Sequence, residues 1–150
     1  MTRLADTIAA CEVRRGSLAI FWLGQAGFAF KTATGQLIFI DAYLSNMCET
    51  TLAGGVMSKR MIPPPLLASE ITHGVMASTH AHQDHHDEET ISRVAANAPH
   101  VQFAGPVSCI RSLKEHGIPG DRQHMLSAGD VRQFDGFSLR AVYADHGNLE

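Results

Sequence analysis

The sequence predicts a mixed α/β fold, in which a β-sheet is layered with helices. β-rich apolar runs joined by turn residues come first, and short apolar runs then alternate with amphipathic helical segments. With 150 residues, 45% of them hydrophobic and 18% charged, the chain can also bury a core of its own. We therefore expect residues 1–150 to form a single domain of the α/β or α+β class.

The first part of the chain predicts one helix and three strands. Apolar residues recur at helical spacing in residues 2–13, and Gly16 follows that run. Three β-rich segments come next, joined by glycine-containing turns, at residues 18–23, 28–31 and 37–40. Asp41 stands directly after the last of them, so we expect its carboxylate at the end of a strand.

A long irregular segment, residues 42–62, interrupts the series. It is rich in Gly, Met and Ser, and Pro63-Pro64-Pro65 follows it. We interpret it as a functional loop or as an insertion that covers the site. Lys59 and Arg60 could clamp a phosphate or carboxylate there, but charges in such loops are usually only solvated, and we expect the second.

The rest of the chain predicts alternating strands and helices. A helical turn, a buried strand, a helix, a strand and a second helix are expected in that order, at residues 66–71, 75–77, 88–97, 101–104 and 107–116. A hairpin closes the series around an Asp-Gly turn, with strands at residues 131–134 and 137–144.

Charge and cysteine content narrow the class of protein. A net charge of −3 without a long basic run argues against nucleic acid or an anionic membrane as the partner. Cys11, Cys48 and Cys109 are widely spaced and form no C-x-x-C pair, so neither a disulfide framework nor a zinc knuckle is indicated. No apolar run is long enough to span a bilayer. We expect a cytoplasmic protein that acts on a small-molecule substrate.

The segment that folding alone does not explain is residues 80–87, which hold four histidines and two aspartates in eight positions. On an extended backbone His80 and His82 would share a face and close on one cation. A bend after them would bring Asp84 and His85 to a neighbouring position. Neutral imidazoles with a carboxylate suit a divalent ion such as zinc, manganese or iron, so two adjacent metal sites are predicted.

Simpler interpretations of these residues also exist. Histidine pairs are common on protein surfaces, but a third histidine and an aspartate in phase, directly after a buried strand, favour metal binding here. His86 faces away from the pair and is expected to be a neighbour of the ligands. Asp87 either supports a ligand from outside the ligand set or caps the following helix. The remaining histidines are expected on the surface: His73, His100, His116 and His124.

The motif in residues 79–85, Thr-His-Ala-His-Gln-Asp-His, resembles the H-x-H-x-D-H signature of the metallo-β-lactamase fold superfamily. Other segments resemble the branch of that superfamily that contains L-ascorbate-6-phosphate lactonase. They are residues 21–27, residues 40–44, the D-H-x-D form of residues 84–87, Gly105-Pro106 and Gly129-Asp130. The likeness covers nearly the whole chain.

The resemblance implies a role for each candidate residue. His80 and His82 would bind the first metal with His146, and Asp84 and His85 would bind the second. Asp41 would hold a ligand imidazole in its productive tautomer. The family's bridging Asp and last His would lie beyond Glu150, because the family fold is an αββα sandwich of which this chain covers only the N-terminal half. The chain is then either a fragment or one of two copies that pair as a homo-oligomer, and one sheet face is left exposed.

The resemblance therefore implies a metal-dependent hydrolase that uses a metal-activated water on an ester or lactone. The substrate would be small and anionic, resembling a sugar phosphate, and Asp84 would be the catalytic carboxylate. The cofactor would be zinc or manganese, with two ions in the complete protein. The alternatives are a phosphodiesterase or nuclease of the same superfamily, and a non-catalytic metal-binding half-domain that needs a partner or its missing half.

Overall fold

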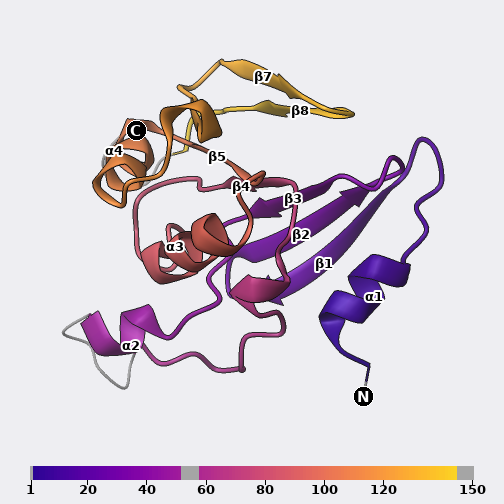
Figure 1. Ribbon diagram of the computed structural model, residues 1–150, viewed down its shortest axis with the longest axis horizontal. Helices are drawn as coiled ribbons and strands as arrows, with labels where there is room; N and C mark the ends of the chain where they lie inside the picture. Colours follow the sequence, from indigo (N-terminus) through magenta and orange to yellow (C-terminus); the bar gives the residue numbers. More distant parts are fainter. Residues whose placement is uncertain (1, 52–57, 145–150) are drawn as a thin grey trace.

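A computed structural model describes residues 2–51 and 58–144 of the chain. Its larger sheet has six strands, which lie side by side in chain order (Figure 1). They are β1 (Leu18–Gly24), β2 (Gly27–Thr32), β3 (Leu37–Ile40), β4 (Val75–Ala77), β5 (Gln102–Gly105) and β6 (Gln123–Met125). The mixed α/β class predicted from the sequence is confirmed.

The pairing of the strands decides where the site forms. β1, β2 and β3 pair antiparallel, whereas β3, β4, β5 and β6 pair parallel. Parallel strands need crossover connections, and the helices supply them. The helices are α1 (Leu4–Ala10), α2 (Met47–Thr51), α3 (Glu88–Asn97), α4 (Val107–Glu115) and the short 3-10 helices η2 (Ala68–Glu70) and η3 (Gly120–Arg122). The segments that follow β3, β4 and β5 therefore meet at one edge of the sheet.

One face of the sheet carries the hydrophobic core. Phe39, Met76 and Phe103 are paired in register across three neighbouring strands, are 1–6% exposed and belong to one cluster with Ile91 of α3 and Leu113 of α4. Because side chains at paired positions of adjacent strands point to the same face, these three form an apolar surface that packs against the helices. α3 is amphipathic, and its apolar side is buried against the sheet.

The opposite face is only partly covered. A second sheet of two strands, β7 (Val131–Phe134) and β8 (Phe137–Arg140), lies apart from the first in Figure 1. It is tied to the larger sheet by a hydrogen bond of 2.9 Å from Gln36 Nε2 to Asp135 Oδ2. On β1, by contrast, Leu18, Ile20 and Trp22 are 50%, 61% and 57% exposed.

Several predicted boundaries were wrong. The leading helix is shorter than residues 2–13, and the last strand ends at Arg140 instead of residue 144. The irregular segment 42–62 contains α2, while residues 52–57 lie outside the described part of the chain. β6 was not predicted, because Gln-His-Met has no apolar alternation and is a strand only through its parallel pairing with β5.

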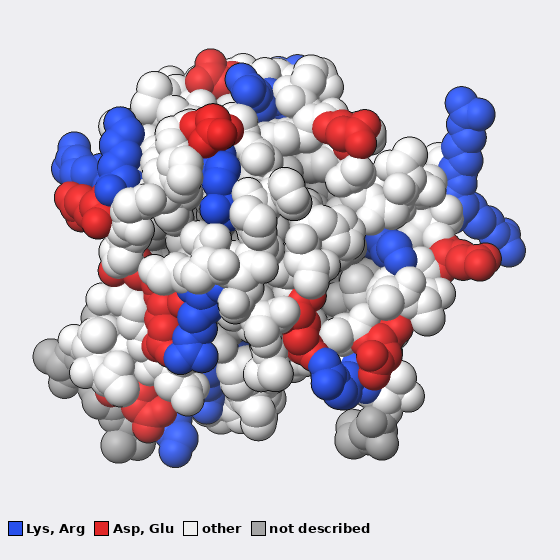
Figure 2. All heavy atoms as spheres, in the orientation of Figure 1, with Lys and Arg blue, Asp and Glu red and all other residues white. Residues whose placement is uncertain are grey.

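The surface carries both signs of charge. On the face shown in Figure 2, Lys and Arg side chains are interspersed with Asp and Glu. Cys48 and Cys109 are buried and Cys11 is half-buried, and all three are free thiols. Among the helices of residues 2–51 and 58–144, none has the length and apolar character needed to cross a membrane.

Candidate metal site

The histidine-rich segment follows β4, at the carboxyl edge of the parallel strands. The ladder continues past the strand ends, since Asp41 N–H donates to the Ala77 carbonyl at 3.0 Å and Ser78 N–H donates to the Ala104 carbonyl at 2.9 Å. Asp41, after β3, therefore lies beside Thr79, after β4. Binding sites of α/β sheets commonly form at this edge.

Asp41 is the buried anchor of the site. It is 4% exposed, and its backbone has a left-handed φ of 49°, which Asp tolerates better than most residues. Its Oδ1 accepts from Thr79 N–H at 2.7 Å. Its Oδ2 accepts from Thr79 Oγ1 at 2.8 Å and contacts His85 Nδ1 at 2.9 Å. One carboxylate thus holds both ends of the loop that contains the candidate ligands.

Three candidate ligands lie in ring contact. The His80 ring centroid is 4.6 Å from that of His82 and 4.1 Å from that of His85. Asp84 Oδ2 is 3.7 Å from His85 Nε2. The structure therefore brings together four of the five predicted metal ligands, and the fifth, His146, lies outside the described residues.

The backbone that brings them together is a turn. We predicted an extended backbone at His80 and His82 with a bend after them. The bend after them is present, since His85 N–H and His86 N–H both donate to the His82 carbonyl, at 2.9 and 2.7 Å. The extended backbone was wrong, because residues 79–82 themselves form a bend. The chain must reverse direction between β4 and α3, and main-chain hydrogen bonds stabilise that reversal. The imidazoles meet because the loop folds back on itself, whereas the prediction relied on alternation along a strand.

The imidazole and carboxylate groups are suitable ligands for a divalent ion, although their side chains are not arranged around a common point. Within residues 2–51 and 58–144, no group of three or more His, Cys, Asp or Glu has the arrangement of a bound ion. The chemistry nevertheless suits a metal. A carboxylate can only accept from His85 Nδ1, so the neutral imidazole has its lone pair on Nε2, on the side of Asp84. This is how histidine ligands of metals are usually oriented.

Asp87 lies directly after the histidine loop, at the start of α3. It is 1% exposed, and its side chain accepts from Thr90 N–H as the N-cap of α3. It also accepts from Thr90 Oγ1, from Leu44 N–H, and from both the N–H and the Oγ of Ser45. The helix cap left open by the sequence is therefore present, and Asp87 also ties α3 to the segment after β3.

His86 points away from the other histidines. It is 3% exposed, and its Nδ1 lies 2.9 Å from Ser78 Oγ. Burial lowers the pKa of His86, because the low-dielectric interior disfavours the imidazolium, and nearby Glu88 opposes this effect. The side chain is oriented toward Ser78, in agreement with its expected position beside the ligand set.

Arg60 does not behave as predicted. We expected a solvated charge, but the side chain is 7% exposed and its guanidinium stacks over the Tyr43 ring at 4.7 Å. It donates to the carbonyls of Tyr43 and Ile62. Arg60 therefore braces the backbone after β3, while Lys59 lies at the surface, 3.9 Å from Glu49.

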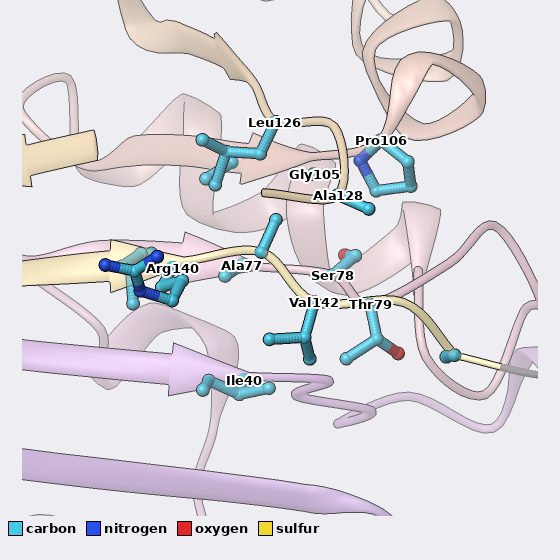
Figure 3. A pocket seen from close by; sticks show the side chains of 14 residues that line it. Ile40, Ala77, Ser78, Thr79, Gly105, Pro106, Leu126, Ala128, Arg140 and Val142 are labelled. Carbon is cyan, nitrogen blue, oxygen red and sulfur yellow. The ribbon is translucent and has the colours of Figure 1, made fainter. Parts of the chain in front are cut away.

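A cavity of about 210 Å³ borders the loop. Figure 3 shows it between the carboxyl ends of the parallel strands and the chain that follows β8. Its lining is mostly apolar and includes Ile40, Pro106, Leu126 and Val142. Thr79 lines the cavity and also bonds to Asp41, so the cavity and the histidine loop share a residue.

Two features escaped the sequence-based prediction. The motif predicted no role for Thr79, the hydroxyl residue directly before the first histidine, which bonds to Asp41. His124 was expected on the surface and is partly buried. Its Nε2 lies 2.8 Å from Gln102 Oε1, and its ring contacts Phe134 edge-on. The other three histidines expected on the surface are exposed: His73, His100 and His116.

Known proteins resemble the chain over most of its length. The UPF0173 metal-dependent hydrolase of Polynucleobacter asymbioticus is 28% identical to it over 142 residues, which cover 90% of this chain and 44% of that protein. This chain is a distant homologue of metal-dependent hydrolases.

Two other homologues carry a more specific name. The probable L-ascorbate-6-phosphate lactonases UlaG of Salmonella heidelberg and Shigella boydii are 25% and 26% identical to the chain over 159 aligned positions. Those alignments cover 94% of this chain and 45% of each lactonase. No family model matches the chain. The chain thus spans less than half the length of the curated hydrolases that it matches.

Proposed function

We propose that this chain carries the histidine-rich part of the active site of a metal-dependent hydrolase. The observation that carries the proposal is the contact of 2.9 Å between the buried Asp41 carboxylate and His85 Nδ1. A surface histidine does not need such a buried partner, whereas a metal ligand does, because the partner fixes its tautomer and ring orientation. The distant homology to metal-dependent hydrolases supports the same function.

Each candidate residue has a role in this proposal. His80 and His82, with His146, hold one divalent ion, and Asp84 and His85 hold a second; zinc or manganese suits this mixture of imidazole and carboxylate. A bound ion of this kind supplies Lewis acidity and activates water. Asp41 keeps the proton on His85 Nδ1. The Asp84 side chain is 45% exposed and can therefore both ligate and orient a water molecule against a substrate.

We further propose that the substrate is a small anionic ester or lactone, of the sugar-phosphate type. The support is the name of the UlaG relatives, which describes a lactonase acting on a phosphorylated sugar acid. The cavity beside Thr79, of about 210 Å³, lies at the same edge of the sheet as the histidines and is a space near them in which a small molecule could bind.

A second candidate function is a non-catalytic metal-binding half-domain. The observation that favours it is that the side chains of residues 2–51 and 58–144 form no complete three-ligand group. In this case a partner would supply the remaining ligands, and a second copy of this chain is the simplest partner. Metal binding is common to both candidates, and only turnover separates them.

The first test is metal binding by equilibrium dialysis of the 150-residue chain against zinc and manganese. The double variant His80→Ala with His82→Ala should lose most of the bound metal, because two imidazoles of one site are removed. The matched control is His73→Ala with His100→Ala, which removes two exposed histidines elsewhere and should bind metal as the unchanged chain does. Equal binding by both double variants would refute the assigned site.

The second test is hydrolysis of a sugar lactone by the chain and by any longer reading frame that contains it. The hydrolase proposal expects metal-dependent turnover that the His80→Ala, His82→Ala variant abolishes. Metal binding without turnover in the longer protein would favour the non-catalytic half-domain instead.

A further inference from the structure

We propose that the Thr79 hydroxyl is a hydrogen-bond relay that fixes the tautomer of His80, so that the single carboxylate of Asp41 orients two imidazoles. His85 contacts Asp41 directly, and His80 is linked to it through Thr79. Thr79 is then a positioning residue for the metal site. Its effect on metal affinity rests on the proposed function, whereas its effect on the His80 tautomer does not.

The relay follows from counting hydrogen atoms. Thr79 Oγ1 has one hydrogen and lies 2.8 Å from Asp41 Oδ2 and 3.0 Å from His80 Nδ1. The carboxylate has no hydrogen to give, so the Thr79 hydroxyl must donate to Asp41. The contact with His80 can then be a hydrogen bond only if His80 Nδ1 carries the proton and donates it to Thr79 Oγ1.

The consequence lies at the other nitrogen of the ring. A neutral imidazole has a single N–H, so a proton on Nδ1 leaves the lone pair of His80 on Nε2. His85 reaches the same state through its direct contact with Asp41. Both rings are therefore prepared to offer Nε2 to a cation before any cation arrives, which lowers the free-energy cost of organising the ligands.

The backbone holds the relay in place. Thr79 N–H donates to Asp41 Oδ1 at 2.7 Å, independently of the side chain. Because that bond survives a change of side chain, replacing Thr79 by Val removes the hydroxyl while keeping the shape and the main-chain tether. Replacing Thr79 by Ser keeps the hydroxyl and is the matched control.

The direct test is the tautomeric state of His80 and His85 in the metal-free chain, measured by nitrogen-15 NMR of the imidazole nitrogens. In the unchanged chain and in Thr79→Ser, both rings should carry the proton on Nδ1. In Thr79→Val, His80 should shift toward the Nε2–H form, while His85 should keep its proton on Nδ1. A His80 ring that stays Nδ1–H in Thr79→Val would overturn the relay, as would an equal change in both rings.

The second readout is zinc affinity by competition with a chelator. Thr79→Val should bind zinc roughly tenfold more weakly or worse, the usual effect of losing a partner that orients a ligand, and Thr79→Ser should bind close to the unchanged chain. An unaltered affinity in Thr79→Val would overturn the role in metal binding. If the unchanged chain binds no zinc, the proposed function fails, and the NMR result alone then decides the relay.

Discussion

Two buried aspartates hold the histidine loop, and they do so by different means. Asp41 accepts from groups within the loop itself, Thr79 and His85. Asp87 accepts from groups outside it, on Ser45 and Thr90 among others. The first orients side chains that can bind a metal, and the second fixes the position of the loop relative to α3. Replacing Asp41 and replacing Asp87 should therefore have different effects.

The loss of Asp87 should act mainly on stability. Asp87→Ala removes the cap of α3, leaves the buried N–H of Ser45 without its acceptor and leaves that of Leu44 with only the longer bond of 3.3 Å to Thr90 Oγ1, at a cost of about 3 kcal/mol. Chemical denaturation measures this as a lower free energy of unfolding. Asp121→Ala, at an exposed position, should change it by less than about 0.5 kcal/mol. Similar values for the two variants would contradict the central role of Asp87.

For single residues, the sequence predicted which candidate ligands lie together better than it predicted contacts with residues distant in the chain. The ligand candidates His80, His82, Asp84 and His85 do lie together, because they are close in the chain and a short loop cannot separate them. The environments of Arg60 and His124 could not be predicted. Each depends on partners that are distant in sequence, and nothing local to these residues indicates such partners.

Among the helices and strands as well, features that depend on local sequence were predicted and features that depend on distant partners were not. α3 was predicted with its observed bounds, because its apolar face, acidic first turn and Asp cap are all local signals. β6 was missed because it is a strand only through its pairing with the neighbouring strand β5. The mixture of antiparallel and parallel pairing was likewise beyond local pattern, although the order of strands and helices indicated the α/β class.

The ring contact between His124 of β6 and Phe134 of β7 predicts a pH effect. Burial, and next the charge of Arg132, lower the pKa of His124 below its ordinary value, while the unfolded chain keeps that ordinary value near 6.5. Between the two values the unfolded state binds more protons, so stability is full above about pH 6.5 and is lost as the pH falls below it. His124→Gln should reduce this loss when unfolding is measured from pH 7 to pH 5.

The matched control for this experiment is His100→Gln, at an exposed position in the loop before β5. It should follow the pH dependence of the unchanged chain. Part of the loss should persist in His124→Gln, since burial lowers the pKa of His86 in the same direction. A His124→Gln variant with the full loss of stability at pH 5 would show that the His124 contact carries none of it.

For the whole molecule, the uncovered part of the sheet at β1 is an exposed apolar surface. Leu18, Ile20 and Trp22 project from alternate positions of β1, so their exposed side chains lie on one face. Apolar patches of this kind favour association. We expect the 150-residue chain to self-associate, with a weight-average mass in analytical ultracentrifugation that rises with concentration.

Charge on this face should suppress the association. Leu18→Lys with Ile20→Lys should give a mass closer to that of the monomer at every concentration. The control is Leu67→Lys with Val107→Lys, which adds the same charge at residues that are 58% and 57% exposed and belong to no strand of the sheet. If the control suppresses association equally, net charge is responsible and the β1 face is not.

The distance along the chain between the histidines and their anchor has a thermodynamic consequence. His80, His82, Asp84 and His85 are neighbours in sequence and can gather around an ion even when the chain is unfolded, whereas Asp41 lies 38 residues before Thr79 and reaches it only after β3 and β4 have paired. An ion that also binds the unfolded chain stabilises the native state only by the difference between the two affinities. The melting temperature should therefore rise less on addition of metal than the native affinity alone implies, and the orientation provided by Asp41 sets the size of that rise.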